Sequence, residues 1–526
     1  MLFQRNPTIR LRSLPRPAAP ALLVSAVLLA MAGCTTVGPD YRGAPPVAAE
    51  ALKAPRFVRD GAGAGNASNA PGTALATSSN QATAPSSAPS GKPVAAPTAA
   101  WWLSLNDPQL NALIDQALAN SPTLQAAQAR LRQSRAALRQ QEAQRMPKGS
   151  ASALGAGVWQ APGTRSESTL HLYSVGFDAT WEADLFGGTR RATEAATAQA
   201  ESVQADLADA QVSLAAEVAQ AYASLRAQQQ RQDLLRATAT ADAQTLDLTR
   251  QRQSRGVSAA DDVEQRLLQG ESTQASLADV AAQISMSLDQ LAVLTGQAPG
   301  ALDAPLASSS GHLPALPDTV AIGDPSGLLQ RRPDIRAAER RLAASQARIG
   351  QKEAGYFPKL TLLGDIGMAG TDLGHLLTSK SLALVGVPYL SWNVLDFGRT
   401  QAEVRQAEAG RDEAVAQYHA TVLSALQDAN TALSRYGQQR QALMHLLAQQ
   451  ASAERSLALA QQRRQAGAGS QLDLLDAQRN QVTAALRTLD GEAALVKDFV
   501  SLQKSLGLGW GVGGTGTPPS DAVSKD

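Results

Sequence analysis

The residue types that most often do chemistry in proteins are sparse in this chain and are not arranged for catalysis. The sequence has one cysteine, and it has neither a G-x-S-x-G nucleophile motif nor a P-loop. The five histidines show no metal-ligand spacing and stand at His171, His312, His375, His419 and His445. The sequence therefore predicts a protein that is not an enzyme, with no catalytic residues, no bound metal and no cofactor.

Charged residues do recur at matched positions, each shortly after a glycine. Asp262 lies six residues after Gly256, and Asp473 lies six residues after Gly467. The ordinary interpretation of such charges is a solvated helix face. The alternative is that these acids, which occupy equivalent positions in two related segments, lie together at a constriction of the protein. Whether they do depends on how the chain's elements are arranged.

The matched positions belong to an internal duplication with an offset of 211 residues. Six landmarks recur at this offset: Pro122 and Pro333, Met146-Pro147-Lys148 and Phe357-Pro358-Lys359, Trp181 and Trp392, Phe186-Gly187 and Phe397-Gly398, Gly256 and Gly467, and Gly296 and Gly507. The period is far longer than the roughly 20–50 residues of solenoid and propeller repeats. One long structural unit is therefore built twice, and each half must do the same geometric job.

The N-terminus has the features of a secretory signal. Four arginines precede the apolar run Ala21–Ala32, which is shorter than the roughly 20 residues that a membrane-spanning helix needs. Met31-Ala32-Gly33-Cys34 resembles a lipobox, in which the signal is cut before Cys34 and the thiol is acylated. By resemblance to bacterial lipoproteins, Thr35 favours sorting to the outer membrane. We therefore expect residues 1–33 to be a signal peptide and Cys34 to be the lipidation site.

Composition divides the remaining chain and excludes one class of partner. Without the signal, the chain has 43 basic and 46 acidic residues, so no basic field favours nucleic acid. Residues 61–100 are almost entirely small or polar and are expected to form a disordered linker. The other expected segments are an acylated N-terminal segment (34–60), a first structural repeat (101–296), an inter-repeat equatorial segment (297–332), a second repeat (333–507) and a flexible C-terminal tail (508–526).

Each repeat contains a candidate β-hairpin, at about 148–182 and about 359–392. Apolar and polar residues alternate over 173–182, and 360–368 repeats this pattern more weakly. A soluble sheet with one buried face would give the same pattern. The secretory signal and the acylation site favour a lipid-facing barrel with a polar lumen.

The number of strands limits how such a barrel can be built. Backbone groups inside lipid must all be paired, so a membrane sheet must close on itself. The smallest such barrels have about eight strands, and this chain has four. Several copies must therefore contribute to one barrel, and the sequence predicts an oligomer.

Long helices follow each hairpin. Residues 189–254 contain neither proline nor glycine, and a helix of this length extends about 100 Å. Its partner, 257–295, follows a single turn at Gly256. The second copy runs over 400–465, turns at Gly467 and returns to Leu506, with apolar residues at a seven-residue step. Glutamine, arginine and glutamate on the other faces indicate coiled-coil helices in water, in the periplasm.

Several motifs in order resemble the OprM/NodT family of outer-membrane efflux lipoproteins. They are Gly33-Cys34-Thr35-Thr36-Val37-Gly38-Pro39-Asp40-Tyr41, Trp101-Trp102 with Leu105-Asn106-Asp107-Pro108, Trp392 with Leu395-Asp396-Phe397-Gly398, and Leu472-Asp473-Leu474-Leu475-Asp476-Ala477-Gln478-Arg479. The resemblance extends from Cys34 to about Trp510, except for the linker.

This resemblance implies a mainly α fold with a small β part. A TolC-like homotrimer would have a 12-strand β-barrel, four strands per chain, continuous with a long α-helical periplasmic barrel. It implies the outer-membrane channel of a tripartite efflux pump, a passive exit duct for drugs and small toxic compounds. The partners would be a periplasmic adaptor (membrane fusion) protein, an inner-membrane RND transporter driven by proton flow, and outer-membrane lipid.

The resemblance also assigns roles to the two turns. Gly256-Val257-Ser258 and Gly467-Ala468-Gly469-Ser470 resemble the tips that adaptors contact, although simple turns would account for the glycines equally well. The expected periplasmic gate consists of Asp262, Arg464, Leu472, Asp473, Asp476 and Arg479. Asp473 and Asp476 would form acidic rings, and Leu472 would form an apolar plug. Asp262, Arg464 and Arg479 would form the bonds that tie the inner helices to their neighbours, and Asp476 and Arg479 can also pair locally. Arg464 stands where the family usually has tyrosine, and we expect an Arg464–Asp262 ion pair in its place.

Two other functions fit part of the pattern. The outer-membrane channel of a type I protein-secretion system would share the architecture, although the lipobox and the Val37–Tyr41 start argue against it. An acylated coiled-coil scaffold without a pore would also carry long helices, and it would conduct no ions. An envelope hydrolase is disfavoured because no nucleophile and base are paired.

Overall fold

The computed structural model describes residues 36–54, 56–59, 100–158, 170–307, 311–317, 320, 322 and 325–510. The expected signal peptide, the acylation site Cys34 and nearly all of the expected linker lie outside these residues. The chain divides into two compact units. The first contains residues 136–198 and 343–412 with the N-terminal segment up to Gly43, and the second contains residues 44–135, 199–342 and 413–526.

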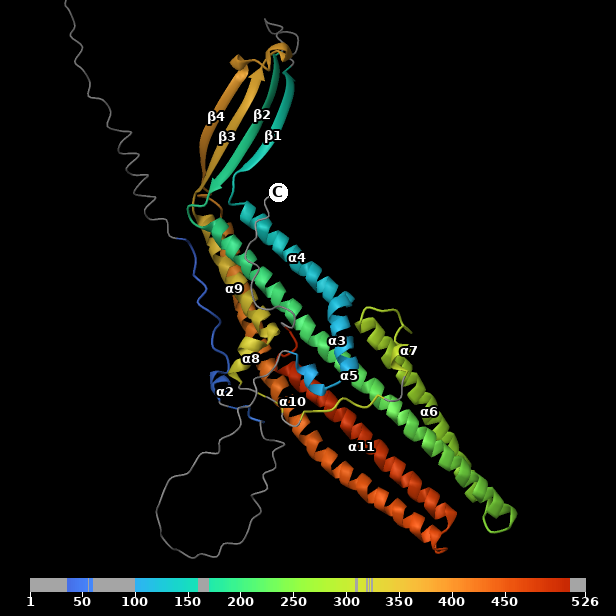
Figure 1. Ribbon diagram of the computed structural model, residues 1–526. Helices are drawn as coiled ribbons and strands as arrows, with labels where there is room; N and C mark the ends of the chain where they lie inside the picture. The colour runs from blue at the N-terminus through green and yellow to red at the C-terminus, as the bar shows by residue number, and fades with distance from the viewer. Residues whose placement is uncertain are drawn as a thin grey trace, which may run out of the picture. The chain divides into compact units, whose positions relative to one another are not determined.

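The first unit contains a four-stranded antiparallel sheet in the order β1-β2-β3-β4 (Figure 1). The strands are β1 (Lys148–Val158), β2 (Leu170–Ala183), β3 (Lys359–Gly370) and β4 (Leu382–Ser391). Strands β1 and β2 come from the first half of the chain, and β3 and β4 from the second. The two hairpins meet where β2 pairs with β3, so β1 and β4 are left as the two edges.

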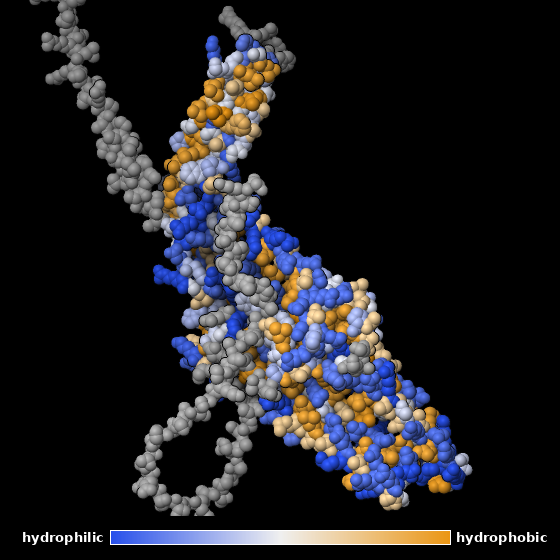
Figure 2. Space-filling view, in the orientation of Figure 1, coloured by the Kyte–Doolittle hydropathy of each residue, from blue (hydrophilic) through white to orange (hydrophobic). Residues whose placement is uncertain are grey.

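One face of this sheet is apolar and exposed. Side chains opposite each other in neighbouring strands point to the same face, and Phe177, Ile366 and Leu384 form one such row. Phe177 is 67% exposed and Leu384 is 80% exposed. Figure 2 shows hydrophobic residues gathered over the strands. An apolar sheet face that is this exposed on a single chain needs an apolar environment around the chain.

The ends of the strands are tied to the ends of helices in the same way in both halves. The indole Nε1 of Trp181 donates to the carbonyl oxygen of Arg145 at 2.9 Å, and that of Trp392 donates to the carbonyl oxygen of Tyr356 at 3.0 Å. The duplication therefore preserves a specific hydrogen bond as well as the order of the elements.

An N-terminal strap, residues 36–41, packs onto the same unit. The amide of Val37 donates to the carbonyl oxygen of Phe186 at 3.0 Å. The guanidinium of Arg191, 5% exposed, donates to the carbonyl oxygens of Val37 and Gly38 and to the carboxylate of Asp40. One arginine side chain therefore holds three groups of the strap.

The long helices are α5 (Gly188–Ser254), α6 (Ala260–Leu294), α10 (Arg399–Gln465) and α11 (Gln471–Ser505). Helices α5 and α10 each contain 67 residues, α6 and α11 each contain 35, and the bounds of the second pair are displaced by 211 residues from those of the first. Figure 1 shows α6 running back alongside α5, and α11 alongside α10. The preceding helices, α4 (Pro122–Ala143) and α9 (Pro333–Glu353), both begin at a proline, a residue that suits the first position of a helix.

The second unit has a core in which short elements pack onto the long helices. These elements are α2 (Ala49–Lys53), η1 (Trp101–Leu105), α3 (Pro108–Asn120), α7 (Asp303–Leu306) and α8 (Ser326–Arg331). Trp102 is 1% exposed, and Leu52, Phe57, Leu306 and Leu328 lie in the same core. The remaining short elements, η2 (Ala354–Tyr356), η3 (Leu373–His375) and η4 (Ser379–Ser381), lie in the first unit.

Two expected boundaries need correction. The first structural repeat was expected to start at residue 101, but Val47, Leu52 and Phe57, in the segment before it, are already buried in the core of the second unit. The flexible tail was expected to start at residue 508, but Leu508 is buried and the indole of Trp510 donates to the carbonyl oxygen of Arg331 at 2.9 Å. Both errors arise because short segments of low periodicity are ordered by packing against helices distant in sequence.

The expected fold class, mainly helical with a small four-stranded part, is confirmed. Among the described helices, α6 alone is long and apolar enough to cross a membrane by length and composition. Helices buried in soluble cores pass the same test. Within this chain α6 is the return arm of a hairpin: the hydroxyl of Thr273 donates to the carboxylate of Asp242 on α5 at 2.7 Å.

Candidate functional site: the tips of the long helical hairpins

The two long hairpins reverse direction at glycines. Gly256 has φ 71° and Gly467 has φ 73°, a left-handed conformation that glycine adopts without steric cost. The amide of Val257 donates to the carbonyl oxygen of Arg252 at 2.9 Å, which closes the end of α5. The amide of Ala468 does the same at the end of α10, bonding to Arg463 at 2.8 Å. Both tips are therefore defined turns, and Figure 1 shows them at the same end of the two hairpins.

The acids that follow the tips cap the returning helices. The carboxylate of Asp262 accepts hydrogen bonds from the hydroxyl of Ser258 at 2.7 Å and from the amide of Ala259 at 3.0 Å. The carboxylate of Asp473 accepts from the amide of Ser470 at 3.0 Å, and the hydroxyl of Ser470 accepts from the amide of Asp473 at 3.0 Å. This reciprocal arrangement is a capping box.

These hydrogen bonds keep both acids charged. The hydroxyl of Ser258 and the amide of Ala259 lower the pKa of Asp262 below its usual value. The side chain and the amide of Ser470 likewise lower the pKa of Asp473. Hydrogen bonding to the ionised form favours that form. Each tip therefore carries a fixed negative charge near its turn.

The remaining gate candidates lie on two helices, Arg464 on α10 and the others on α11. The guanidinium Nε of Arg464 donates to the side-chain oxygen of Gln471 at 2.9 Å, across its own tip. Leu472 is half-buried, and Leu475, one turn later, is buried. Within one chain, Arg464 therefore contacts Gln471, and its described contacts do not include Asp262.

The expected local pairing of Asp476 with Arg479 is replaced by contacts with the other hairpin. Asp476 pairs with Arg266 of α6 at 3.2 Å, and Arg479 lies 3.8 Å from Asp242 of α5. Asp242 is 7% exposed and also accepts the hydroxyl proton of Thr273. A buried carboxylate gains more from a partner than an exposed one, so the contact across hairpins is favoured over the local pair.

Sequence reasoning missed Arg266, Asp242 and Thr273. Their types give no signal on helices rich in charged and polar residues. An additional ion pair further from the tips joins Arg231 of α5 to Asp490 of α11 at 2.7 Å. Among the described residues, these three ionic contacts therefore tie the two hairpins of one chain together. In the described part of the chain, no group of three or more metal-ligating side chains is assembled.

A family model described as "Outer membrane efflux protein" matches residues 113–297 and 325–508, once for each half of the chain. The chain is 33% identical over 421 residues to outer membrane protein OprJ of Pseudomonas aeruginosa, covering 79% of this chain and 87% of OprJ. It is 31% identical over 420 residues to the toluene efflux pump outer membrane protein TtgC of Pseudomonas putida, covering 78% of this chain and 85% of TtgC.

Solved structures agree with this assignment. The outer-membrane channel OprN is similar with a TM-score of 0.75 and 33% identity, covering 90% of this chain and all of that one. The MtrE outer membrane channel of Neisseria gonorrhoeae is similar with a TM-score of 0.73 and 26% identity, covering 90% and 98%. Because a family model matches well over half of the chain and both halves separately, the chain belongs to the outer membrane efflux protein family of TolC-like channels.

Proposed function

We propose that this chain forms, as a homotrimer, the passive exit duct of a tripartite efflux pump. The duct carries small toxic organic compounds out of the cell, is gated at its periplasmic end, and takes no chemical part in transport. Its partners are a periplasmic adaptor protein and an inner-membrane RND transporter, which supplies the energy. The names of its relatives, which refer to antibiotic, toluene and solvent efflux pumps, favour this function over type I protein secretion.

The observation that carries the proposal is the sheet. It has four strands and an exposed apolar face, and among the described residues no further strand pairs with its two edges, β1 and β4. Unpaired edge groups cannot be left in lipid, and four strands are about half of the smallest known membrane barrel. Three chains would supply twelve strands by pairing β1 of one chain with β4 of the next. The polar residues of the other face, such as Asp178 and Asp365, would then line a lumen.

Cross-linking between strand edges tests the closure. We would place a cysteine at Ala153 of β1 and combine it in turn with one at Leu382 or Leu384 of β4, all on the apolar face. Oxidation should give a ladder that ends at three chains on a non-reducing gel. As the matched control, cysteines at Phe177 and Ile366, which are partners within one chain, should give only an internal disulfide. Bands that stop at one chain, or that continue beyond three, would refute the trimeric barrel.

Ion conductance in planar bilayers tests the duct itself. The purified protein should produce discrete channel currents, and a coiled-coil scaffold without a pore should produce none. The closed state is expected to conduct little, so the gate variants below provide the positive signal.

The gate proposal rests on charges fixed at the tips. We propose that Arg464 pairs with Asp262 of a neighbouring copy, and that Asp473 and Asp476 contribute acidic rings with Leu472 as an apolar plug. Arg464→Ala should raise the open fraction of single channels, and Arg463→Ala, at the adjacent exposed arginine, should not. Asp262→Asn keeps the helix cap and should match Arg464→Ala without adding to it in the double variant. If Gln471→Ala reproduces the whole effect, Arg464 acts within its own tip and the pairing between copies is wrong.

The adaptor proposal rests on the exposed tips, Gly256-Val257-Ser258 and Gly467-Ala468-Gly469-Ser470. Val257 is 64% exposed and is the one large apolar side chain among these residues. Val257→Asp should abolish drug resistance in cells while leaving trimer formation and single-channel currents unchanged. Loss of the currents as well would show that the tip acts in folding and not in adaptor contact.

A further inference from the structure

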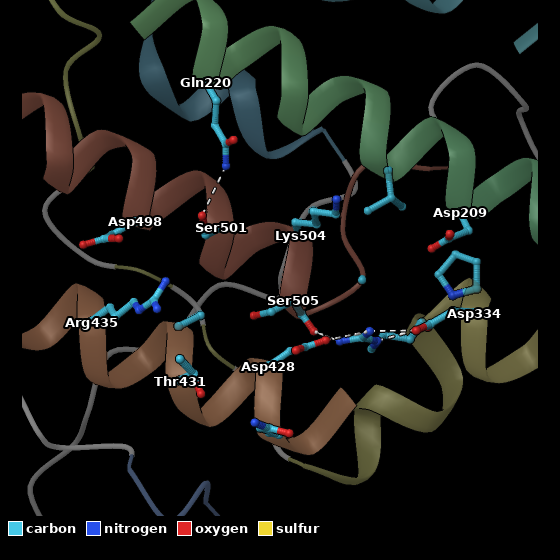
Figure 3. A pocket seen from close by; sticks show the side chains of 16 residues that line it. Asp209, Gln220, Asp334, Asp428, Thr431, Arg435, Asp498, Ser501, Lys504 and Ser505 are labelled. Atoms are coloured by element: carbon cyan, nitrogen blue, oxygen red, sulfur yellow. Dashed lines mark hydrogen bonds and ion pairs between the residues drawn. The ribbon is translucent and has the colours of Figure 1, made fainter. Parts of the chain in front are cut away.

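The second unit contains a charged cavity well away from the tip residues in sequence. Its volume is about 540 Å³, within the range of small-molecule sites. Four segments line it: α5, the start of α9, α10 and the end of α11 (Figure 3). Acidic, basic, polar and small apolar side chains all contribute to the lining.

Arg332 forms one wall, and four of its five N–H donors are used within the chain. Its guanidinium donates to both carboxylate oxygens of Asp334 at 3.0 and 2.7 Å, to Asp428 at 3.3 Å and to the carbonyl oxygen of Ser505 at 3.0 Å. Gly507 passes so close that a Cβ there would lie 2.8 Å from the Arg332 side chain. This network fixes the shape of the cavity and neutralises two of its four acids.

The other two acids have no such partner. Asp209 of α5 and Asp498 of α11 make no hydrogen bond or ion pair that the described part of the chain supplies. Burial raises the pKa of Asp209, with a further contribution from nearby Asp334. Burial also raises the pKa of Asp498, against the opposing influence of Arg435. Half-buried carboxylates without partners are costly, and a bound cation would remove that cost.

The two acids stand at opposite ends of the cavity, as Figure 3 shows. Lys504, whose charge acts on Asp209, follows Asp498 by six residues on α11. A helix rises about 1.5 Å per residue, so Lys504 and Asp498 are about 9 Å apart along the axis of α11. The lining also includes the apolar side chains of Val212, Pro333 and Ala432. The site is therefore acidic at both ends and has apolar side chains in its lining.

We propose that this cavity binds organic dications, with one ammonium group on Asp209, the other on Asp498, and an apolar chain between them. Lys504 and Arg435 are exposed, and their charges, which act on Asp209 and Asp498 respectively, weaken the binding of a cation. The proposal concerns ligand binding by the folded chain. It does not depend on ion conduction, which is measured separately.

Calorimetric titration of the full-length protein in detergent tests the proposal, with octane-1,8-diamine as the probe. We expect saturable binding of one diamine per chain, and no binding of octanedioate, which has the same spacing and the opposite charge. Spermidine should bind more weakly, because its central ammonium group would lie near Arg332. Binding of octanedioate in preference to the diamine, or equal binding of spermidine, would overturn the proposed ligand class.

Variants assign the two ends of the ligand. Asp209→Asn and Asp498→Asn should each weaken diamine binding at least about tenfold, because each removes a charge-assisted contact. Asp279→Asn, at an exposed acid of α6 outside the cavity, is the matched control and should bind normally. Lys504→Met removes a competing cation and should strengthen binding, a change that misfolding cannot produce. Unchanged affinity in both cavity variants, or no binding by the wild-type protein, would overturn the proposal even if its channel currents are normal.

Discussion

Replacing Arg191 should release the N-terminal strap from the first unit. Its side chain is almost fully buried, and it donates to the carbonyl oxygen of Val37 at 3.1 Å and to that of Gly38 at 2.8 Å. A hydrogen bond from a charged donor contributes about 1.5–3 kcal/mol. Losing these two bonds therefore costs at least about 3 kcal/mol, which corresponds to about a hundredfold shift in the docking equilibrium. Asp40 is exposed and is left out of this sum.

Arg191→Met keeps most of the apolar stem and removes only the guanidinium. Hydrogen exchange reports the result, because the amide of Val37 is protected by its bond to Phe186 and exchanges when the strap opens. We expect exchange at Val37 to be about a hundredfold faster in the variant.

The neighbouring arginine provides the control. Arg190 lies 60% exposed and pairs with Glu194 at 3.3 Å, one helical turn away. Arg190→Met removes a surface ion pair of little energetic value and should leave exchange at Val37 unchanged. Equal protection of Val37 in the two variants would show that backbone packing holds the strap and that the energetic reasoning from Arg191 is wrong.

Three further outcomes follow from single contacts. Trp392→Phe should lower the free energy of unfolding by about 1 kcal/mol in a denaturant titration, because it removes one neutral hydrogen bond. Gly507→Ala should destabilise by more than about 1 kcal/mol in the same assay, since its φ is 73° and the new methyl group would collide with Arg332. Acid should loosen the tips. The preceding serines lower the pKa values of Asp262 and Asp473 in the folded protein. The stability that these two carboxylates contribute is therefore complete above the usual pKa of 3.8 and is lost as the pH falls through their lower folded values. Pepsin should then cut the tips faster, and asparagine variants, which cannot titrate, should show no such onset.

The helices of this fold could be predicted from the sequence because proline and glycine mark equivalent helix ends in both halves of the chain. Pro122 and Pro333 begin equivalent helices, and Gly256 and Gly467 end equivalent helices. Each boundary was therefore supported by two independent stretches of sequence. The strands were readable for a similar reason, since period-two alternation over residues 173–182 lies within β2.

Contacts between segments that are distant in sequence could not be predicted from the sequence. Asp476 has Arg479 one turn away in sequence, yet it pairs with Arg266, which lies on another hairpin. Choosing between these partners requires the packing of α6 against α11, which no local pattern specifies. Arg191 and the strap that it holds are separated by about 150 residues, and one of two adjacent arginines at the start of a polar helix gives no sign of such a partner.

The ionic contacts between the hairpins also show how the duplication became asymmetric. The first hairpin contributes Arg266 and Asp242, and the second contributes Asp476 and Arg479. The positions displaced by 211 residues carry no charge: they are Ala477 and Ala453 for the first pair, and Gln265 and Leu268 for the second.

In the proposed trimer, the first and second hairpins of the three chains alternate around a ring. Each hairpin therefore contacts one hairpin of its own chain and one hairpin of a neighbouring chain. The four charged residues pair within each chain. The equivalent positions on the surfaces that would face the neighbouring copy carry no charge. Opening should therefore separate chains from one another before it separates the two hairpins of one chain. A short thiol cross-linker between cysteines at Arg266 and Asp476 should then leave the open state of Arg464→Ala accessible, whereas a cross-link between neighbouring tips should abolish it. Loss of opening in the first case would mean that the hairpins of one chain must part, and the asymmetry would have no role in gating.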